Sequence, residues 1–146
     1  MNTMSTFNPC QTYLLLLACS SKAVVRVGAV GEVALTPGCY LYIGSARRHL
    51  AARLARHRRT QKPFHWHIDY LLGSGVLAIQ EIWLSLTSTE CALAGTLLQH
   101  PAVTVPHPRL GASDCRCPAH FLRWQEQLAS IRHFLLALGL RPKSAT

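Results

Sequence analysis

The hydrophobic pattern near the start of the chain predicts a central strand and a hairpin. Residues 12–19 form a continuous apolar run with no polar face, which is typical of a strand that is covered on both sides. Two shorter apolar segments follow at residues 24–27 and 32–35, and Gly28 and Gly31 separate them. Glycine supplies the backbone freedom that tight hairpin turns require, so we expect these two segments to pair with each other.

A further strand is predicted at residues 38–46, whose sequence is GCYLYIGSA. Side chains alternate between the two faces of a strand, so Tyr40, Tyr42 and Gly44 share one face and the aliphatic residues between them share the other. Two phenols on one face need polar partners, which makes this strand a candidate wall of a functional site.

Residues 46–60 are rich in Ala, Leu and Arg, and this composition predicts the first helix. Leu50 and Leu54 lie one turn apart and form a narrow apolar stripe. With a rotation of about 100° per residue, Arg53 and His57 lie beside that stripe. We therefore expect both side chains to face the rim of the sheet that the helix covers.

The second half of the chain predicts further helices, strands and loops. Residues 64–72 fit either a strand or a short helix, and we favour a helix that Gly73 closes. Thr87 stands three residues before Glu90, which fits a capping box that opens another helix. The remaining predictions are a strand at 76–86, a loop-rich segment at 103–119, a short strand after 118 and a C-terminal helix at 125–138.

Strands and helices in this order predict an α+β domain. We expect a small mixed or antiparallel sheet flanked by helices, with an extra hairpin and a C-terminal helix. A length of 146 residues suits one such domain. The predicted organisation is a disordered segment at 1–10, the domain at 11–121, a helical extension at 122–140 and a tail at 141–146.

The chain is strongly basic, and its charge is concentrated. The net charge is +9, seven Lys and Arg residues fall between positions 47 and 62, and no acidic residue occurs from 33 to 68. Such a field attracts polyanions, so nucleic acid is the first partner to consider, with a solvated basic helix face as the alternative. The candidates for contacts with nucleic acid are Arg47, Arg48, Arg56, Arg58 and Lys62.

Six cysteines in a chain of this size and apolar content predict reduced thiols and a cytoplasmic protein, rather than a secreted disulfide framework. The apolar run at residues 13–18 is shorter than the core of a signal peptide. No apolar run approaches the roughly 20 residues that cross a bilayer, so we expect no membrane association.

Several motifs occur together along the chain. Tyr42-Ile43-Gly44 reads YIG, Arg53 and His57 follow in the predicted helix, and Glu90 begins a later helix. Three longer stretches accompany them: HWHIDY at 65–70, ECALA at 90–94, and GASDCRCP at 111–118 with His120. In these motifs the chain resembles the GIY-YIG nucleases. It is most similar to their small standalone branch, described as domain of unknown function 123 or as Uri-type endonucleases, over residues 11–121.

The first half of the family motif has two candidate tyrosines. Tyr13 lies at the start of the first strand, whereas Tyr40 directly precedes YIG. The family carries the two halves of its motif on separate neighbouring strands, so the resemblance favours Tyr13 and keeps Tyr40 in reserve. Gln11 stands where the family has glycine, and the basic residues 47–49 occupy a shortened form of the family's glycine-rich link.

The resemblance implies hydrolysis of phosphodiester bonds with a single Mg²⁺ or Mn²⁺ ion. Glu90 offers a carboxylate for that ion, and Arg53 presents a planar fork that matches phosphate oxygens. The resemblance further implies Tyr13 as the base, with Tyr42 and His57 assisting, and nearby cations would favour the phenolate. His57 titrates near neutrality and is the alternative base.

Each of these residues also has an ordinary structural role when it is considered alone, as a helix cap, a strand phenol or a solvated charge. Their joint occurrence in the family's order favours the functional interpretation. Cys115, Cys117 and His120, joined by Cys91, could bind zinc, but the spacing is not a standard one. We favour a tight turn with buried thiols, in which Asp114 bonds the backbone.

The predicted function is therefore that of a metal-dependent endonuclease, structure-directed or nonspecific, that nicks DNA. Branched, nicked or flapped DNA are the substrates to test. The alternatives are a nucleic-acid-binding module that keeps the fold without cleavage, and a zinc-stabilised interaction domain.

Overall fold

The computed structural model describes residues 11–46, 48–85, 87–112 and 115–143. No helix within these residues is long and apolar enough to span a bilayer. The elements in chain order are β1 (Gln11–Cys19), β2 (Ala23–Val27), a 3₁₀ turn (Gly28–Val30), β3 (Gly31–Leu35), β4 (Gly38–Ala46), α1 (Leu50–Arg58), α2 (His67–Gly73), β5 (Leu77–Ser85), α3 (Glu90–Leu98), β6 (Val103–Thr104), β7 (Phe121–Trp124), α4 (Leu128–Ala137) and β8 (Arg141–Pro142).

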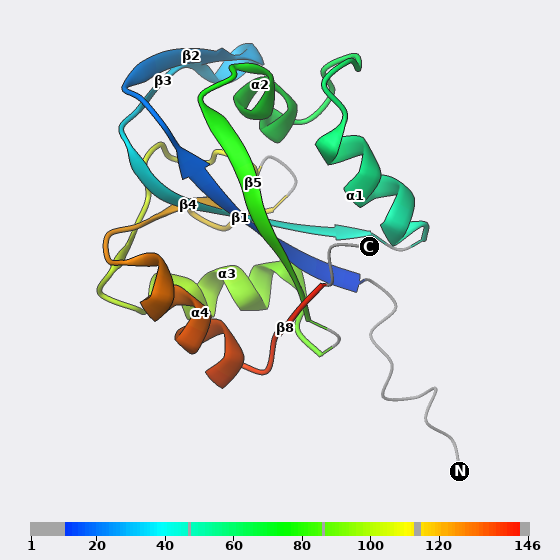
Figure 1. Cartoon of the computed structure of the whole chain (residues 1–146), viewed down its shortest axis with the longest axis vertical. Helices are drawn as coiled ribbons and strands as arrows, with labels where there is room; N and C mark the ends of the chain where they lie inside the picture. The colour runs from blue at the N-terminus through cyan, green and yellow to red at the C-terminus, as the bar shows by residue number, and fades with distance from the viewer. Residues whose placement is uncertain (1–10, 47, 86, 113–114, 144–146) are drawn as a thin grey trace.

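The described strands form an antiparallel sheet in the order β6-β7-β4-β1-β5-β8, and β2 and β3 pair as a separate hairpin. This arrangement confirms the predicted α+β class. Helices α1 and α2 and the hairpin lie on one side of the sheet, and α3 and α4 lie on the other (Figure 1). β1 occupies the centre because its continuous apolar run can be covered on both faces.

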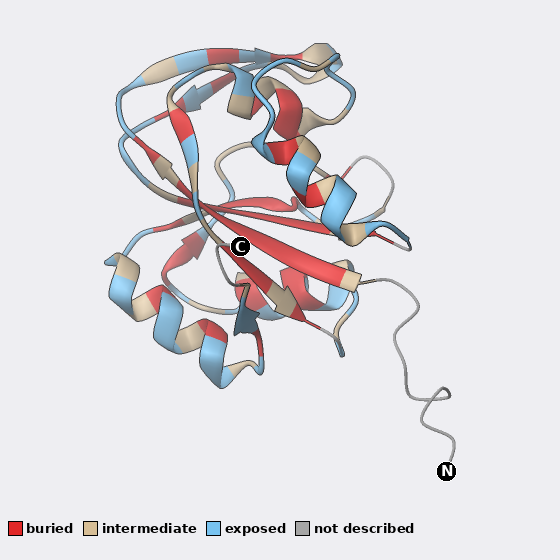
Figure 2. Ribbon diagram, turned by 45° about the vertical axis from the view of Figure 1, so that its right-hand side comes forward, coloured by how far each residue is buried: buried red, intermediate tan, exposed pale blue. Residues whose placement is uncertain are grey.

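The alternation of side chains along β1 and β4 divides the core into two clusters. Tyr13, Tyr40 and Tyr42 belong to the cluster beneath α1 and α2, whereas Leu41 and Ile43 belong to the cluster beneath α3 and α4. The buried residues concentrate along the central strands between the two helical layers (Figure 2). The two phenols of β4 therefore share a face, as the alternation predicted.

Most element predictions are confirmed, with differences at their ends. The hairpin, the strand at 38–46 and the helical choice for 64–72 are confirmed. Helix α1 begins at Leu50 rather than at Ala46, because β4 continues to Ala46 and His49 adopts a left-handed backbone conformation with φ of 57°. The short strands β6 and β8 were not predicted.

The cap of α3 differs from the predicted one in a way that affects the site. Thr89, rather than Thr87, is the N-cap residue, and its hydroxyl accepts a hydrogen bond from Ala92 N at 3.1 Å. Glu90 is the first residue of the helix, so the predicted capping box is wrong. Its carboxylate is consequently available for other contacts.

The segment after residue 121 is an integral part of the core. β7 pairs with β4 through Leu41 and Leu122 and lies between β4 and β6. Ile131 and Leu135 of α4 are fully buried in the cluster beneath the sheet. The predicted segment 1–10 and residues 144–146 of the predicted tail 141–146 lie outside the described residues, whereas Arg141–Pro142 of that tail form β8 and pair with β5.

Candidate active site and metal-ligand cluster

Strand β1 and helix α1 bring Tyr13 against His57. The Tyr13 hydroxyl lies 2.6 Å from His57 Nε2, and the two ring centroids are 5.5 Å apart. Both side chains are almost fully buried, with exposed fractions of 1% and 2%. His57 therefore faces the sheet, in the direction that the helical spacing predicted.

Burial sets the protonation states of this pair. Burial, followed by the positive charge of Lys62, lowers the pKa of His57 to about 4, so its imidazole is neutral near pH 7. Burial raises the pKa of Tyr13 above its ordinary value and outweighs the opposing effect of Arg53. A neutral phenol and a neutral imidazole thus share the hydrogen bond, and the imidazole is able to accept the phenolic proton.

Gly44 makes the close approach of Tyr13 possible. The two residues are opposite each other in the β1–β4 ladder. A Cβ atom at position 44 would lie 2.5 Å from both Cζ and the hydroxyl oxygen of Tyr13. The glycine of YIG therefore leaves the space that the Tyr13 hydroxyl fills.

Arg53 lies between the end of β4 and the aromatic ring of Trp66. Its Nη1 donates a hydrogen bond to the Ser45 carbonyl at 2.6 Å, and its guanidinium carbon lies 4.5 Å from the centre of the Trp66 ring. Hydrogen bonding and stacking on an aromatic face hold a guanidinium in a defined orientation. The fork of Arg53 is therefore positioned before any ligand binds.

Glu90 reaches the same end of β4 from the opposite helical layer. Its Oε1 accepts a hydrogen bond from Ser45 Oγ at 3.0 Å, and its Oε2 lies 3.2 Å from His120 Nδ1. The second contact has the distance of an ion pair without the alignment of a hydrogen bond. His120, then Ser45 and Arg53, lower the pKa of Glu90, whose side chain is 36% exposed. The carboxylate is thus ionised and accessible at neutral pH.

A cavity of about 300 Å³ lies at this end of β4. Tyr42, Arg53 and Glu90 line it directly, and Gly44 forms the part of the wall beside the Tyr13 hydroxyl. Although α3 packs against the other face of the sheet, its first residue extends around the end of β4 to this cavity. The five predicted site residues therefore converge: Tyr13, Tyr42, Arg53, His57 and Glu90.

Two of the predicted nucleic-acid contacts are instead bound within the fold. Arg56 Nη1 donates to both carboxylate oxygens of the buried Asp69, at 2.9 and 3.0 Å, and the guanidinium stacks on Trp66. The Lys62 side chain is only 2% exposed and donates to the carbonyls of Arg56 and His57. Both cations stabilise the connection between α1 and α2, whereas we expected them to contact nucleic acid at the surface.

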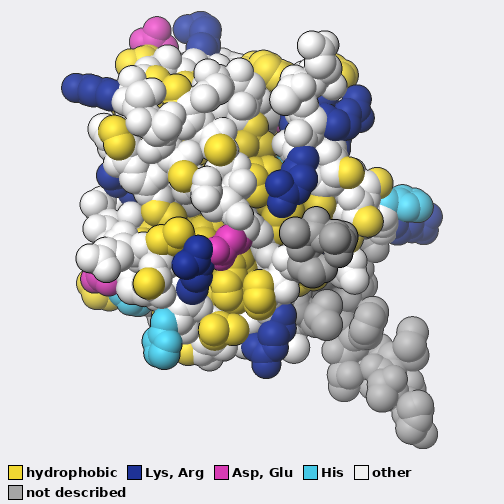
Figure 3. Space-filling view, viewed as in Figure 1, with side chains coloured by type: hydrophobic (Ala, Val, Ile, Leu, Met, Phe, Trp, Pro, Cys, Tyr) yellow, Lys and Arg dark blue, Asp and Glu magenta, His cyan; other side chains and the backbone are white. Residues whose placement is uncertain are grey.

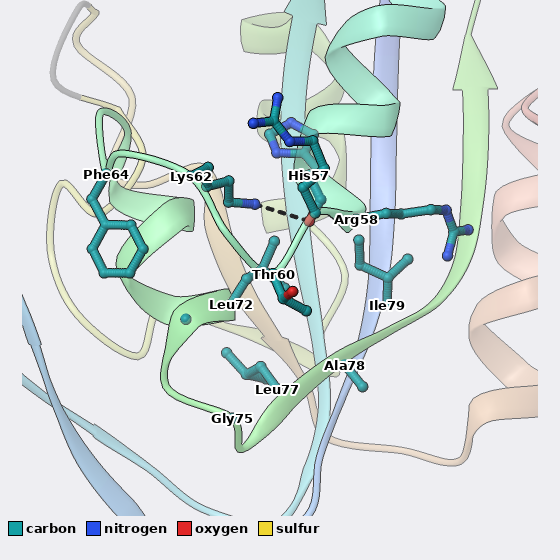
Figure 4. A pocket seen from close by; sticks show the side chains of 12 residues that line it. His57, Arg58, Thr60, Lys62, Phe64, Leu72, Gly75, Leu77, Ala78 and Ile79 are labelled. Carbon is teal, nitrogen blue, oxygen red and sulfur yellow. Dashed lines mark hydrogen bonds between the residues drawn. The ribbon is translucent and has the colours of Figure 1, made fainter.

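Arg48 and Arg58 remain exposed, and Arg47 lies outside the described residues. A second cavity, of about 390 Å³, lies between the segment after α1 and strand β5. Figure 4 shows Lys62 turned back toward the His57 carbonyl in this cavity, which Arg58 also lines. On the face shown in Figure 3, Lys and Arg side chains stand apart from one another rather than forming one patch.

Comparison with protein families identifies the family of this chain. Residues 12–139 match the family described as Domain of unknown function DUF123. The chain belongs to the DUF123 family. Comparisons with curated proteins and with solved structures found no match. The DUF123 match extends beyond residue 121 through α4, in agreement with the burial of that helix in the core.

The DUF123 chain also contains a group of metal-ligating side chains next to Glu90. Cys91, Cys115, Cys117 and His120 present ligand atoms that all lie within 4.8 Å of one another, and we call this group the Cys3His cluster. Such a set could hold a metal ion such as zinc. Burial and the neighbouring thiols raise the pKa of Cys91 to about 12 in the absence of a cation. Asp114, predicted to bond the backbone here, lies outside the described residues.

Several residues that line the cavity of about 300 Å³ were not predicted as site residues. Ser45, Trp66 and His67 line it, and His67 Nδ1 accepts a hydrogen bond from Gly111 N at 2.8 Å. Trp66 and His67 belong to the HWHIDY stretch, so the family resemblance was the available signal. Ser45 directly follows YIG, but no local pattern distinguishes it from an ordinary strand serine.

Proposed function

We propose that this chain is a metal-dependent endonuclease that hydrolyses phosphodiester bonds in DNA, and that it belongs to the GIY-YIG superfamily. The observation that carries the proposal is the cavity that an ionised carboxylate and a fixed guanidinium line, with the Tyr13–His57 pair behind its Gly44 wall. A cation at the phosphoryl oxygens, a second fixed charge and a base are the groups that phosphodiester hydrolysis requires.

Glu90 fits a divalent cation by its chemistry and by its surroundings. The carboxylate is ionised, borders the cavity and takes no part in capping α3. One carboxylate together with waters and substrate oxygens is a common way to bind Mg²⁺ or Mn²⁺. When bound, such an ion offsets the charge that develops on the phosphoryl oxygens and the leaving group.

Arg53 supplies the second positive charge. Its contact with the Ser45 carbonyl and its stacking on Trp66 fix the plane of the guanidinium at the cavity wall. A planar fork matches two phosphate oxygens, so Arg53 orients the scissile phosphate as well as attracting it. Because the orientation exists without substrate, little ordering is required when DNA binds.

The Tyr13–His57 pair supplies the base. The Tyr13 hydroxyl occupies the space left by the missing side chain of Gly44, which lines the cavity. The phenol removes a proton from the attacking water as its own proton passes to the neutral imidazole of His57. Tyr42 lines the cavity with its ring 6.5 Å from that of Tyr13 and positions the water.

The positive charge of the chain supports DNA as the substrate. The net charge of +9 favours association with a polyanion, and the exposed Arg48 and Arg58 flank the ends of α1. One set of catalytic groups per chain predicts nicking of one strand. Branched, nicked and flapped duplexes are the substrates with which to determine whether the enzyme recognises DNA structure.

The proposal is tested by incubating the purified full chain with these duplexes and with plain duplex DNA, in Mg²⁺, Mn²⁺ or a chelator. We expect nicks with either ion and none with the chelator. Glu90→Gln and Arg53→Ala should reduce the rate at least 100-fold, because each removes charge stabilisation of the transition state. Glu32→Gln, at an exposed position in β3, should retain the wild-type rate.

The same experiment separates cleavage from binding alone. If no substrate is cut with either ion while salt-sensitive DNA binding persists, the chain is a binding module and the nuclease proposal is wrong. If the Glu90 variant cleaves as fast as the wild type, Glu90 is not the metal ligand.

A further inference from the structure

The Cys3His cluster has the dimensions of a zinc site. His120 Nε2 lies 3.6 Å from Cys115 Sγ and 3.9 Å from Cys91 Sγ. In a tetrahedral site with Zn–S bonds of about 2.3 Å, neighbouring ligand atoms lie about 3.8 Å apart. The widest separation within the cluster is 4.8 Å, so a contraction of about 1 Å is sufficient.

The backbone around the cluster is braced before any metal binds. The guanidinium of Arg109 donates hydrogen bonds to the carbonyls of Cys115 and Cys117. The Leu110 carbonyl accepts from His120 N at 2.9 Å, and the His120 carbonyl in turn accepts from Ile43 N of β4 at 2.9 Å. These bonds place the three loop ligands against the sheet, where the first turn of α3 presents the fourth.

We propose that the Cys3His cluster binds one Zn²⁺ through the sulfurs of Cys91, Cys115 and Cys117 and through Nε2 of His120. Four protein ligands complete the tetrahedral shell, which is the arrangement of a structural zinc site. Binding forms three Zn–S bonds and one Zn–N bond, and the three thiols release their protons to solvent. Cys91 lies in the first turn of α3, where the helix dipole favours a thiolate.

The zinc site also orients the carboxylate of Glu90, and this part of the inference rests on the proposed function. His120 Nδ1 is buried and has no well-formed hydrogen bond to the described residues. Zinc at Nε2 would leave the ring hydrogen on Nδ1, and this nitrogen lies 3.2 Å from Glu90 Oε2. A carboxylate–histidine–zinc chain of this kind holds both groups in one orientation. His120 is therefore a positioning residue for Glu90.

Metal analysis of the full chain tests the zinc site without reference to cleavage. The chain is expressed with a removable tag that lacks histidine and is purified under reducing conditions. We expect one zinc per chain in the wild type and in Cys39→Ser, whose thiol lies outside the cluster. We expect less than one tenth of that content in Cys117→Ser.

Cobalt substitution of the wild type gives a second measurement, which does not depend on the folding of a variant. Chelator-treated wild-type protein refilled with Co²⁺ should show the visible bands of a tetrahedral site and sulfur-to-cobalt charge transfer. Cys117→His should keep the tetrahedral bands while the charge transfer falls by about one third, because two of three thiolates remain. The absence of zinc and of these bands in the reduced wild type would overturn the proposal, as would a native disulfide within the cluster.

The role of His120 is tested by the Mg²⁺ dependence of cleavage. His120→Cys supplies a fourth thiolate, so we expect zinc to remain bound. Without the contact to Glu90, the Mg²⁺ concentration at half-maximal rate should rise about 10- to 100-fold at an unchanged melting temperature. An unchanged Mg²⁺ dependence would overturn the positioning role. Zinc in a wild type that cuts no DNA would refute the proposed function alone, and cleavage by a zinc-free wild type would refute the zinc site alone.

Discussion

The hydroxyl of Tyr13 is held 2.6 Å from Nε2 of His57, in a pair buried between β1 and α1. The other candidate phenol, Tyr40, has a different environment. Its oxygen accepts hydrogen bonds from Thr36 N at 3.1 Å and from Arg123 Nη1 at 2.8 Å, on the side of β4 that adjoins β7. The two phenols therefore have separable roles, one beside the cavity and one in the packing of the loop before β4.

Replacing each phenol by phenylalanine tests this separation. Tyr13→Phe removes the proposed base, so we expect cleavage to fall about 100- to 10,000-fold, within the range of general base catalysis. Tyr40→Phe removes hydrogen bonds and should cost about 1 kcal/mol of the unfolding free energy while the cleavage rate changes less than about threefold. Single-turnover rates and urea unfolding measure the two effects. The opposite pattern would assign the first half of the motif to Tyr40.

The neutral, buried imidazole of His57 predicts a loss of stability in acid. The pKa of His57 is lowered from 6.5 to about 4 in the folded chain, so the unfolded chain binds a proton more readily between these values. Its contribution is therefore complete above pH 6.5 and is lost as the pH falls toward 4, by on the order of 3 kcal/mol. The pKa of Asp69 is lowered too, so its contribution is lost only at lower pH.

Denaturant unfolding at pH 7.5 and 4.5 measures this change. The wild type should lose stability over the interval, and His57→Gln should lose much less because the titrating group is absent. His133→Gln removes an exposed histidine of α4 and should behave as the wild type does. Equal wild-type stability at the two pH values would contradict the assignment of a neutral His57.

The parts of the fold that were predicted correctly depend on short-range patterns. The alternation in GCYLYIGSA is complete within nine residues, so it revealed the shared face of Tyr40 and Tyr42 without knowledge of the partner strands. The predicted N-cap of α3 was wrong because Thr87 and Thr89 are both acceptable cap residues, and tertiary contacts decide between them. Because Thr89 caps α3, Glu90 has no capping role, and capping was the main structural explanation for a glutamate at this position.

The Cys3His cluster and the burial of Lys62 could not be predicted in this way. Cys91 joins the three loop ligands because both segments contact β4: the loop bonds Ile43 through His120, and the first turn of α3 bonds Ser45 through Glu90. Lys62 appeared to be part of a surface charge run, but its amine donates to the carbonyls of Arg56 and His57 and lies 4.0 Å from Asp69 of the next helix. The cluster depends on contacts between segments that are distant in the sequence, and the burial of Lys62 depends on how the chain turns back between α1 and α2.

Gly44 provides a test of the space between β4 and the Tyr13 ring. Gly44→Ala would place a Cβ 2.5 Å from the ring of a residue that is 1% exposed and has no room to move. We expect a loss of about 1–3 kcal/mol of the unfolding free energy and a cleavage rate reduced at least 100-fold.

Gly95→Ala is the matched control, because no heavy atom lies within 4 Å of its added Cβ. In an exposed position of α3 it should stabilise the chain by up to about 1 kcal/mol. Equal effects of the two substitutions would contradict the close approach.

The different surroundings of the basic residues predict different effects on DNA binding. Arg48→Ala and Arg58→Ala remove exposed charges, so each should weaken binding and reduce the slope of log K against log salt by about 0.9 if its side chain contacts one phosphate. Lys62→Ala removes the side-chain donor to the carbonyls of Arg56 and His57, although the Arg56 carbonyl still accepts from Arg59 N. It should cost about 1–3 kcal/mol of stability and leave the salt slope unchanged, because a side chain that is 2% exposed does not reach a phosphate. Fluorescence anisotropy across a salt series and urea unfolding distinguish these outcomes, and a reduced salt slope for the Lys62 variant would show that its amine turns outward to bind DNA.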